Sequence, residues 1–176
     1  MDEGFIPGFD AHLSSIYTAW TMAHFASPIS NMVEDNKFQM YTILVSIHGL
    51  LRWLILLVAV IGLGRTLLAT WQRSTWSPMD RGLSAGYAGL IDLQVLIGVI
   101  LLLWDLLVQP RSLGLALFLH PILMLLAAGA AHMNRRYRNA ANDADKFRGQ
   151  LSVYAISLVL ILVGIYVITS LVPGSV

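Results

Sequence analysis

Two histidines and one arginine lie in apolar parts of this sequence and have the residue types that could do chemistry. His48 and Arg52 are four residues apart in the stretch TILVSIHGLLRWLILLVAVIGLG, and His120 lies in a second apolar stretch. Residues with this spacing share one face of a helix. An ionisable residue inside a membrane helix is costly and indicates a functional site. A neutral imidazole can bind a metal through one ring nitrogen, so the question is which elements would position these three side chains.

The composition is that of an integral membrane protein. The chain has 176 residues, of which 57% are hydrophobic and 12% are charged, whereas soluble domains are about 25% charged. Apolar runs of about 20 residues recur, and each is long enough to span a bilayer as a helix. The sequence has no cysteine, which excludes disulfides, thiolate metal sites and c-type haem attachment.

Four transmembrane helices are predicted, and their short connections favour an all-α, up-down four-helix bundle. They cover about 41–64, 83–104, 113–133 and 151–172. Before them, residues 10–26 have helical apolar spacing and predict a short amphipathic helix at the membrane surface, which Ser27-Pro28 would end. The sequence therefore predicts an outer-face N-terminal segment (1–40) and a transmembrane bundle (41–176).

The arginines and lysines predict the orientation of the chain. Eight of them lie in or beside the first and third connections, and only Lys37 and Arg111 lie on the opposite side. Positive residues are enriched in cytoplasmic loops. Both termini are therefore expected outside.

The predicted topology gives His48 and His120 the same depth. Each lies about seven residues, or roughly 10 Å, below the outer end of its span, and the two spans run in the same direction. Two such histidines suit the iron of a haem, one on each face. The alternative is a pair of histidines hydrogen-bonded within a polar seam of the bundle. His132, at the inner end of its span, is expected to be an interface residue.

Residues of the second span are expected beside this pair. Gly98 lies near the histidine level, where a glycine would let a flat ring approach the backbone. Arg52, one turn deeper than His48, would meet a haem propionate or pair with Asp92 or Gln94. The alternative is a polar cluster that fixes helix packing.

Three short motifs carry a resemblance to a known family. His48-Gly-Leu-Leu-Arg52, Asp92-Leu-Gln94-Val-Leu-Ile-Gly98 and His120-Pro-Ile-Leu-Met124 resemble small bacterial membrane proteins labelled cytochrome b-like. They are also similar to one half of haem A synthase, over about residues 41–172. The resemblance implies a bacterial cytoplasmic membrane protein with one haem b held by His48 and His120. The synthase has two such halves and added acidic residues, so its oxidative activity is not carried over.

The expected function is that of a b-type cytochrome with one haem near the outer face. It would transfer single electrons as a non-catalytic subunit of a larger membrane complex, because two histidines fill both axial positions. Expected partners are the lipid bilayer, complex subunits, and a quinone or external electron carrier. No basic stripe indicates nucleic acid. The alternatives are an accessory subunit of a respiratory or photosynthetic complex, with or without a pigment, and a haem-handling assembly factor.

Overall fold

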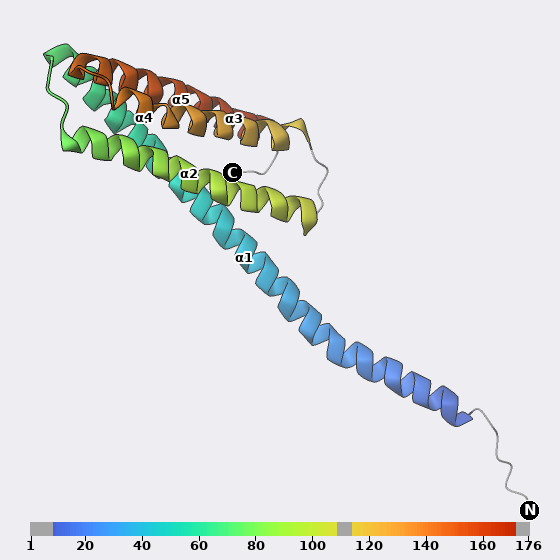
Figure 1. Cartoon of the computed structure of the whole chain (residues 1–176). Coiled ribbons are helices and arrows are strands. Elements are labelled where there is room, and N and C mark those ends of the chain that lie inside the picture. Colours follow the sequence, from blue (N-terminus) through green and yellow to red (C-terminus); the bar gives the residue numbers. More distant parts are fainter. Residues whose placement is uncertain (1–8, 109–113, 172–176) are drawn as a thin grey trace, which may run out of the picture. The chain divides into compact units, whose positions relative to one another are not determined.

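The described part of the chain consists of helices joined by short connections, without strands, as the sequence predicts. The computed structural model describes the backbone of residues 9–108 and 114–171, and side chains from Met32 onward except Val33. The helices are α1 (Phe9–Gln72), α2 (Pro78–Leu107), α3 (Leu115–His132), α4 (Asn134–Tyr137) and α5 (Asp143–Leu171) (Figure 1). Two compact units divide between Ile43 and Leu44, and the helix packing and the candidate site described below lie in the second.

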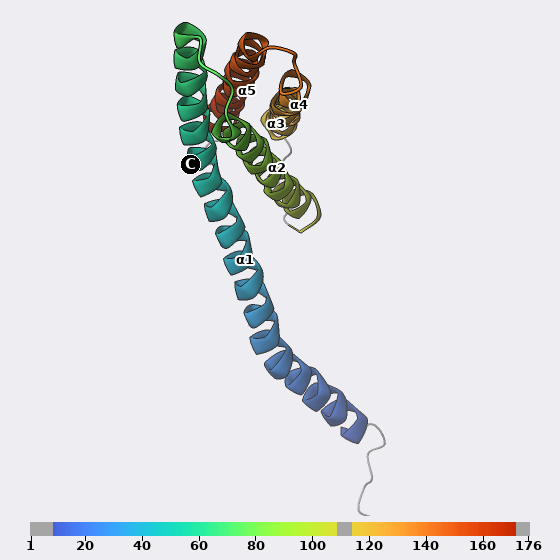
Figure 2. The same cartoon turned by 60° about the vertical axis from the view of Figure 1, so that its left-hand side comes forward.

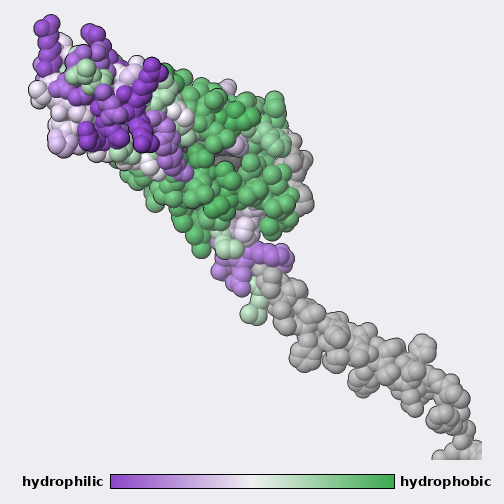
Figure 3. All heavy atoms as spheres, in the orientation of Figure 1, coloured by the Kyte–Doolittle hydropathy of each residue, from purple (hydrophilic) through white to green (hydrophobic). Residues whose placement is uncertain are grey.

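Four helical segments are long and apolar enough to cross a membrane, so the chain has the helices of a multi-pass membrane protein. They are Glu34–Gln72, Pro78–Leu107, Leu115–Tyr137 and Asp143–Leu171. Large apolar side chains cover their outer surface; Leu50 and Tyr166, for example, are 72% and 70% exposed. Figure 3 shows this apolar surface ending at a hydrophilic cap, at the end where Figure 1 places α4 and the α1–α2 connection.

One predicted helix end is wrong. Ser27 and Pro28 were expected to end a short N-terminal helix, but both lie inside α1. A proline removes one backbone hydrogen bond, and a long helix can continue on either side of it, as α3 does around Pro121. The side chains of residues 10–26 lie outside the described part, so the amphipathic character of this segment stays a prediction.

The helices also extend beyond the apolar stretches that predicted them. α1 continues past Gly64 to Gln72, and α5 begins at Asp143 rather than near residue 151. Caps set such ends. α2 begins with a capping box, in which the Ser77 hydroxyl accepts a hydrogen bond from the Asp80 amide, and the Asp80 carboxylate accepts one from the Ser77 amide.

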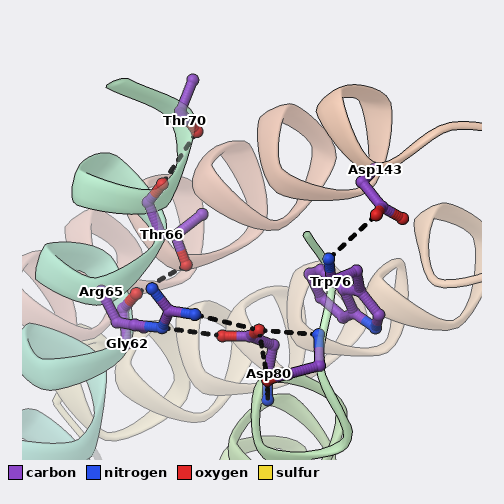
Figure 4. A network of polar contacts seen from close by, with 8 residues as sticks. Gly62, Arg65, Thr66, Thr70, Trp76, Asp80 and Asp143 are labelled. Atoms are coloured by element: carbon purple, nitrogen blue, oxygen red, sulfur yellow. Dashed lines mark hydrogen bonds and ion pairs between the residues drawn. The ribbon is translucent and has the colours of Figure 1, made fainter. Parts of the chain in front are cut away.

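Asp80 also joins α2 to α1. Its two oxygens lie 3.0 and 3.3 Å from Arg65 Nε and Nη2, and the Ser77 hydroxyl donates to it at 2.6 Å (Figure 4). Next to this cluster, the Trp76 amide donates to the Asp143 carboxylate at 3.0 Å. This hydrogen bond ties the α1–α2 connection to the start of α5. Hereafter the Asp80 cluster means Arg65, Ser77 and Asp80.

The core lies where α3 and α5 pack side by side, with α2 against α3 (Figure 2). The buried residues of α3 are all alanines, and small residues let membrane helices approach closely. On the α1 side, a Cβ at Gly62 would overlap the Tyr154 ring of α5. Tyr154 in turn packs on Tyr87, with ring centroids 4.9 Å apart, and the Tyr87 hydroxyl lies 2.7 Å from the Ser157 hydroxyl.

Candidate functional site

His120 is held in one orientation by the backbone of α5. Its Nδ1 lies 2.8 Å from the Gly164 carbonyl oxygen. Because a carbonyl only accepts, Nδ1 must carry the proton and donate. In the neutral ring Nε2 then keeps its lone pair. A hydrogen bond from one ring nitrogen to a backbone carbonyl is a usual way to orient a histidine that ligates a metal through the other nitrogen.

His48 is positioned by close contact with α2. A Cβ at Gly98 would lie only 3.2 Å from His48 Cε1, so glycine lets the imidazole lie against the α2 backbone. The Nδ1 atom of His48 is buried and has no hydrogen-bond partner among the described residues. Buried polar atoms are usually paired, so this nitrogen is an exception within the apolar part of α1.

Gln94 of α2 is hydrogen-bonded to the α1 backbone at His48. Its Nε2 donates to the His48 carbonyl oxygen at 3.0 Å. Gln94 itself is buried, and its Oε1 has no hydrogen-bond partner among the described residues. Gln94 and Gly98 are one turn apart on α2, so a single helix face contacts both the backbone and the ring of His48.

Arg52 belongs to the same neighbourhood. His48 interacts electrostatically with both His120 and Arg52, and His120 also interacts with Arg52. The guanidinium Cζ lies 5.4 Å from the Trp53 ring centroid. Among the described side chains, Arg52 has no ion pair with a carboxylate. The structure therefore brings His48, His120 and Arg52 together and leaves a positive charge beside the two imidazoles.

Asp92 does not join this site, although it was one of the two expected partners of Arg52. Its carboxylate oxygens lie 2.8 and 3.1 Å from His132 Nε2. Asp92 and Gln94 are two residues apart and therefore point to different sides of α2. His132, expected as an interface residue, is part of a polar pair on the surface of α2 and α3.

Gly164 is the residue of the site that the sequence did not predict. The Gly164 carbonyl oxygen accepts the hydrogen bond from His120 Nδ1, and a Cβ at Gly164 would overlap Met124 Cε and lie 3.4 Å from His120 Nδ1. A glycine in the middle of an apolar helix was the available signal, but its partner depends on how α5 is rotated.

Two imidazoles are a donor set that a haem iron could use. Among the described residues, no three His, Cys, Asp or Glu side chains come together as a metal site. Protein sites for zinc, by contrast, usually supply three or four ligands. A haem iron needs only two axial ligands from the protein. Two imidazoles from different helices satisfy that need.

Comparisons with known proteins add no family. No family model, no curated protein and no solved structure matches the chain.

Proposed function

We propose that this protein is a b-type cytochrome that holds one haem b between α1 and α3, with His48 and His120 as axial ligands. It belongs to a bacterial cytoplasmic membrane, in an up-down four-helix bundle with both termini outside. The haem lies near the outer face and passes single electrons within a larger membrane complex.

One observation carries the proposal: the two imidazoles interact electrostatically, and the chain holds each ring in a different way. The Gly164 carbonyl fixes the proton of His120 on Nδ1 and leaves Nε2 available. The His48 ring is held against Gly98, and its buried Nδ1 has no partner in the described part of the chain.

The chain's own residues would set the electronic and steric properties of the site. Bound haem supplies a one-electron redox centre. His48 and His120 would both hold the iron, and a haem with two imidazole ligands would favour electron transfer over oxygen binding. Arg52 provides positive charge that suits a haem propionate. Gln94 and Gly98 hold His48 at a fixed distance from α2. A quinone or an external carrier would be the electron partner.

Substitution of each histidine tests the proposal. His48→Ala and His120→Ala should each abolish the sharp α and β bands of the reduced protein, since each removes an axial ligand. His132→Ala is the matched control, because His132 lies on the same helix as His120 but is bonded to Asp92. The α and β bands of the His132→Ala protein should remain. Bands that survive in both ligand variants, or a wild-type protein without haem, would contradict the proposal.

A single-ligand pigment site is the second candidate, and the asymmetry between the histidines favours it. Only His120 has its tautomer fixed by a hydrogen bond, and a chlorophyll-type pigment needs one imidazole. The chain would then be an accessory subunit of a photosynthetic complex. In that case the purified protein absorbs in the far red, and His120→Ala alone removes the pigment.

A further inference from the structure

Arginines gather at the hydrophilic end of the helices, and the cytochrome proposal does not use them. The hydrogen bond from Trp76 to Asp143 brings the α1–α2 connection next to the start of α5, and α4 packs on α5 at the same end (Figures 1 and 3). The arginines at this end are exposed or half-exposed, and we call them the arginine cap: Arg73, Arg81, Arg135, Arg136, Arg138 and Arg148.

The carboxylates at this end of the helices already have partners. Asp80 forms an ion pair with Arg65. Asp143 forms one with Lys146, and Asp145 accepts a hydrogen bond from a neighbouring asparagine amide. Among the described side chains, no arginine of the cap forms an ion pair with a carboxylate. The cap therefore presents a concentrated positive charge that the described part of the chain does not neutralise.

The arginine cap lies where the candidate membrane spans end. On this side the spans begin or end at Gln72, Pro78, Tyr137 and Asp143, and every arginine of the cap lies close to one of these ends in the sequence. The surface beside the cap is apolar (Figure 3). Trp71 is 83% exposed at this end of α1, and tryptophan at the end of a span usually lies among lipid headgroups. A bilayer that covers the apolar surface therefore has its phosphate groups at the level of the cap.

The backbone at Arg73 is a second, independent observation. Arg73 has a φ of 51°, in the left-handed region that favours glycine. The Ser74 amide donates to the Ala69 carbonyl oxygen at 3.0 Å, so Arg73 occupies the position after a helix where glycine is commonest. A residue held in such a conformation at a cost in stability is typical of functional sites. The side chain of Arg73 is therefore expected to have a use that offsets this cost.

We propose that the arginine cap binds the phosphate groups of anionic phospholipids in the adjacent membrane leaflet. A guanidinium can donate two parallel hydrogen bonds to phosphate oxygens, and each basic residue near an anionic membrane surface adds to the attraction. A nucleic acid would also match the charge, but the apolar surface beside the cap and the exposed Trp71 ring suit a lipid. In the orientation proposed above, this leaflet is the cytoplasmic one. The binding does not depend on haem.

Lipid binding by the purified full-length protein in a neutral detergent tests this proposal. The protein is titrated with phosphatidylglycerol or with phosphatidylcholine, and native mass spectrometry measures the bound lipid. The wild type should bind the anionic phosphatidylglycerol about tenfold or more tightly than the zwitterionic phosphatidylcholine. The triple variant R135Q/R136Q/R138Q should lose most of this preference, because it removes three charges of the cap. R135K/R136K/R138K is the matched control, which keeps the charges and should keep most of the preference.

Arg73→Gly distinguishes lipid binding from a structural role of the arginine. Glycine fits the left-handed backbone, so the solubilised variant should melt at a higher temperature than the wild type. Its binding of phosphatidylglycerol should nevertheless weaken about fivefold, because one charge of the cap is lost. Arg73→Lys keeps both the charge and the backbone cost, so its lipid binding and its melting temperature should stay close to those of the wild type.

Circular dichroism shows whether the triple variants are folded, and Arg73→Gly provides the test if the glutamine variant is not. Three results would overturn the proposal. The first is equal binding of the two lipids by the wild type. The second is a preference for phosphatidylglycerol that persists in full in folded R135Q/R136Q/R138Q and in Arg73→Gly. The third is a wild type that prefers neither lipid and instead binds a short RNA oligonucleotide through the same arginines.

Discussion

Two polar clusters that both involve α1 differ in how completely their atoms are paired. In the Asp80 cluster, the carboxylate receives hydrogen bonds from Arg65 and from the Ser77 amide and hydroxyl. At the histidine site, by contrast, the buried His48 Nδ1 and Gln94 Oε1 have no partners among the described residues. Arg52 interacts electrostatically with both imidazoles and has no ion pair with a carboxylate among the described side chains.

The difference separates a structural cluster from a candidate binding site. Polar groups among apolar helices must find partners, because lipid offers none. The Asp80 cluster is completed within the chain and ties α1 to α2. The histidine site holds its rings in place and leaves ligand atoms available. We therefore expect substitutions in the first cluster to lower stability and substitutions in the second to alter a bound group.

Asp80→Ala should have the largest effect on stability. It removes the partner of Arg65 and the capping box at once, and breaking a buried ion pair costs about 3–5 kcal/mol. Since Arg65 is 26% exposed, water can partly solvate it, and we expect the lower end of that range. Unfolding of the solubilised protein, followed by circular dichroism, measures the loss. Glu34→Ala removes a surface pair with Lys37 and should change stability by less than about 1 kcal/mol.

Gly62→Ala should have the next largest effect on stability. The new Cβ would overlap the Tyr154 ring, and overpacking costs about 1–3 kcal/mol. Gly64→Ala, two residues along the same helix, has open space and should leave stability unchanged or raise it by up to about 1 kcal/mol. The same unfolding assay compares the two. Equal behaviour of both variants would mean that α1 does not pack on α5 at this point.

Arg52→Gln should change the bound haem and leave the fold intact. A positive charge near the iron favours the reduced state, so its removal should lower the midpoint potential. At an effective dielectric constant of about 20 the interaction is about 1–2 kcal/mol, or on the order of 60 mV for one electron. A spectroscopic redox titration measures this shift. An unchanged potential with a loss of folding stability would place Arg52 with the structural residues instead.

Gly98→Ala should have the smallest effect. The added Cβ would lie 3.2 Å from His48 Cε1, so the ring must move by a few tenths of an ångström. We expect a small displacement of the α band with haem still bound and stability within about 1 kcal/mol of the wild type. Gly86→Ala on the same helix has open space and should leave the band where it is. If the α band is unchanged in both variants, His48 does not contact the haem.

The length of the apolar stretches predicted the all-α class and the four apolar helices, because a helix that spans a membrane needs about 20 consecutive apolar residues. Counting residues from the ends of the spans predicted Gly98 near the histidine level, and Gly98 does contact the His48 ring. Depth along a helix is fixed by its rise per residue, so neighbours at matched depth are predictable.

Rotation and tilt of the helices could not be predicted in this way. Asp92 lies at a depth close to that of Arg52, yet it faces His132, because depth does not say which side of α2 a residue occupies. For the same reason, the sequence did not show that Gly164 is the partner of His120, because this depends on the rotation of α5. The link from Arg65 to Asp80 was missed for another reason. Both residues lie outside or at the ends of the apolar runs, where arginine served only as a sign of orientation.

The most direct test of the central claim is a reduced-minus-oxidised visible spectrum of the purified, detergent-solubilised wild-type protein. A haem with two histidine ligands is six-coordinate and low-spin, so the account predicts sharp α and β bands on reduction. A featureless spectrum from protein that carries no extractable haem would contradict it.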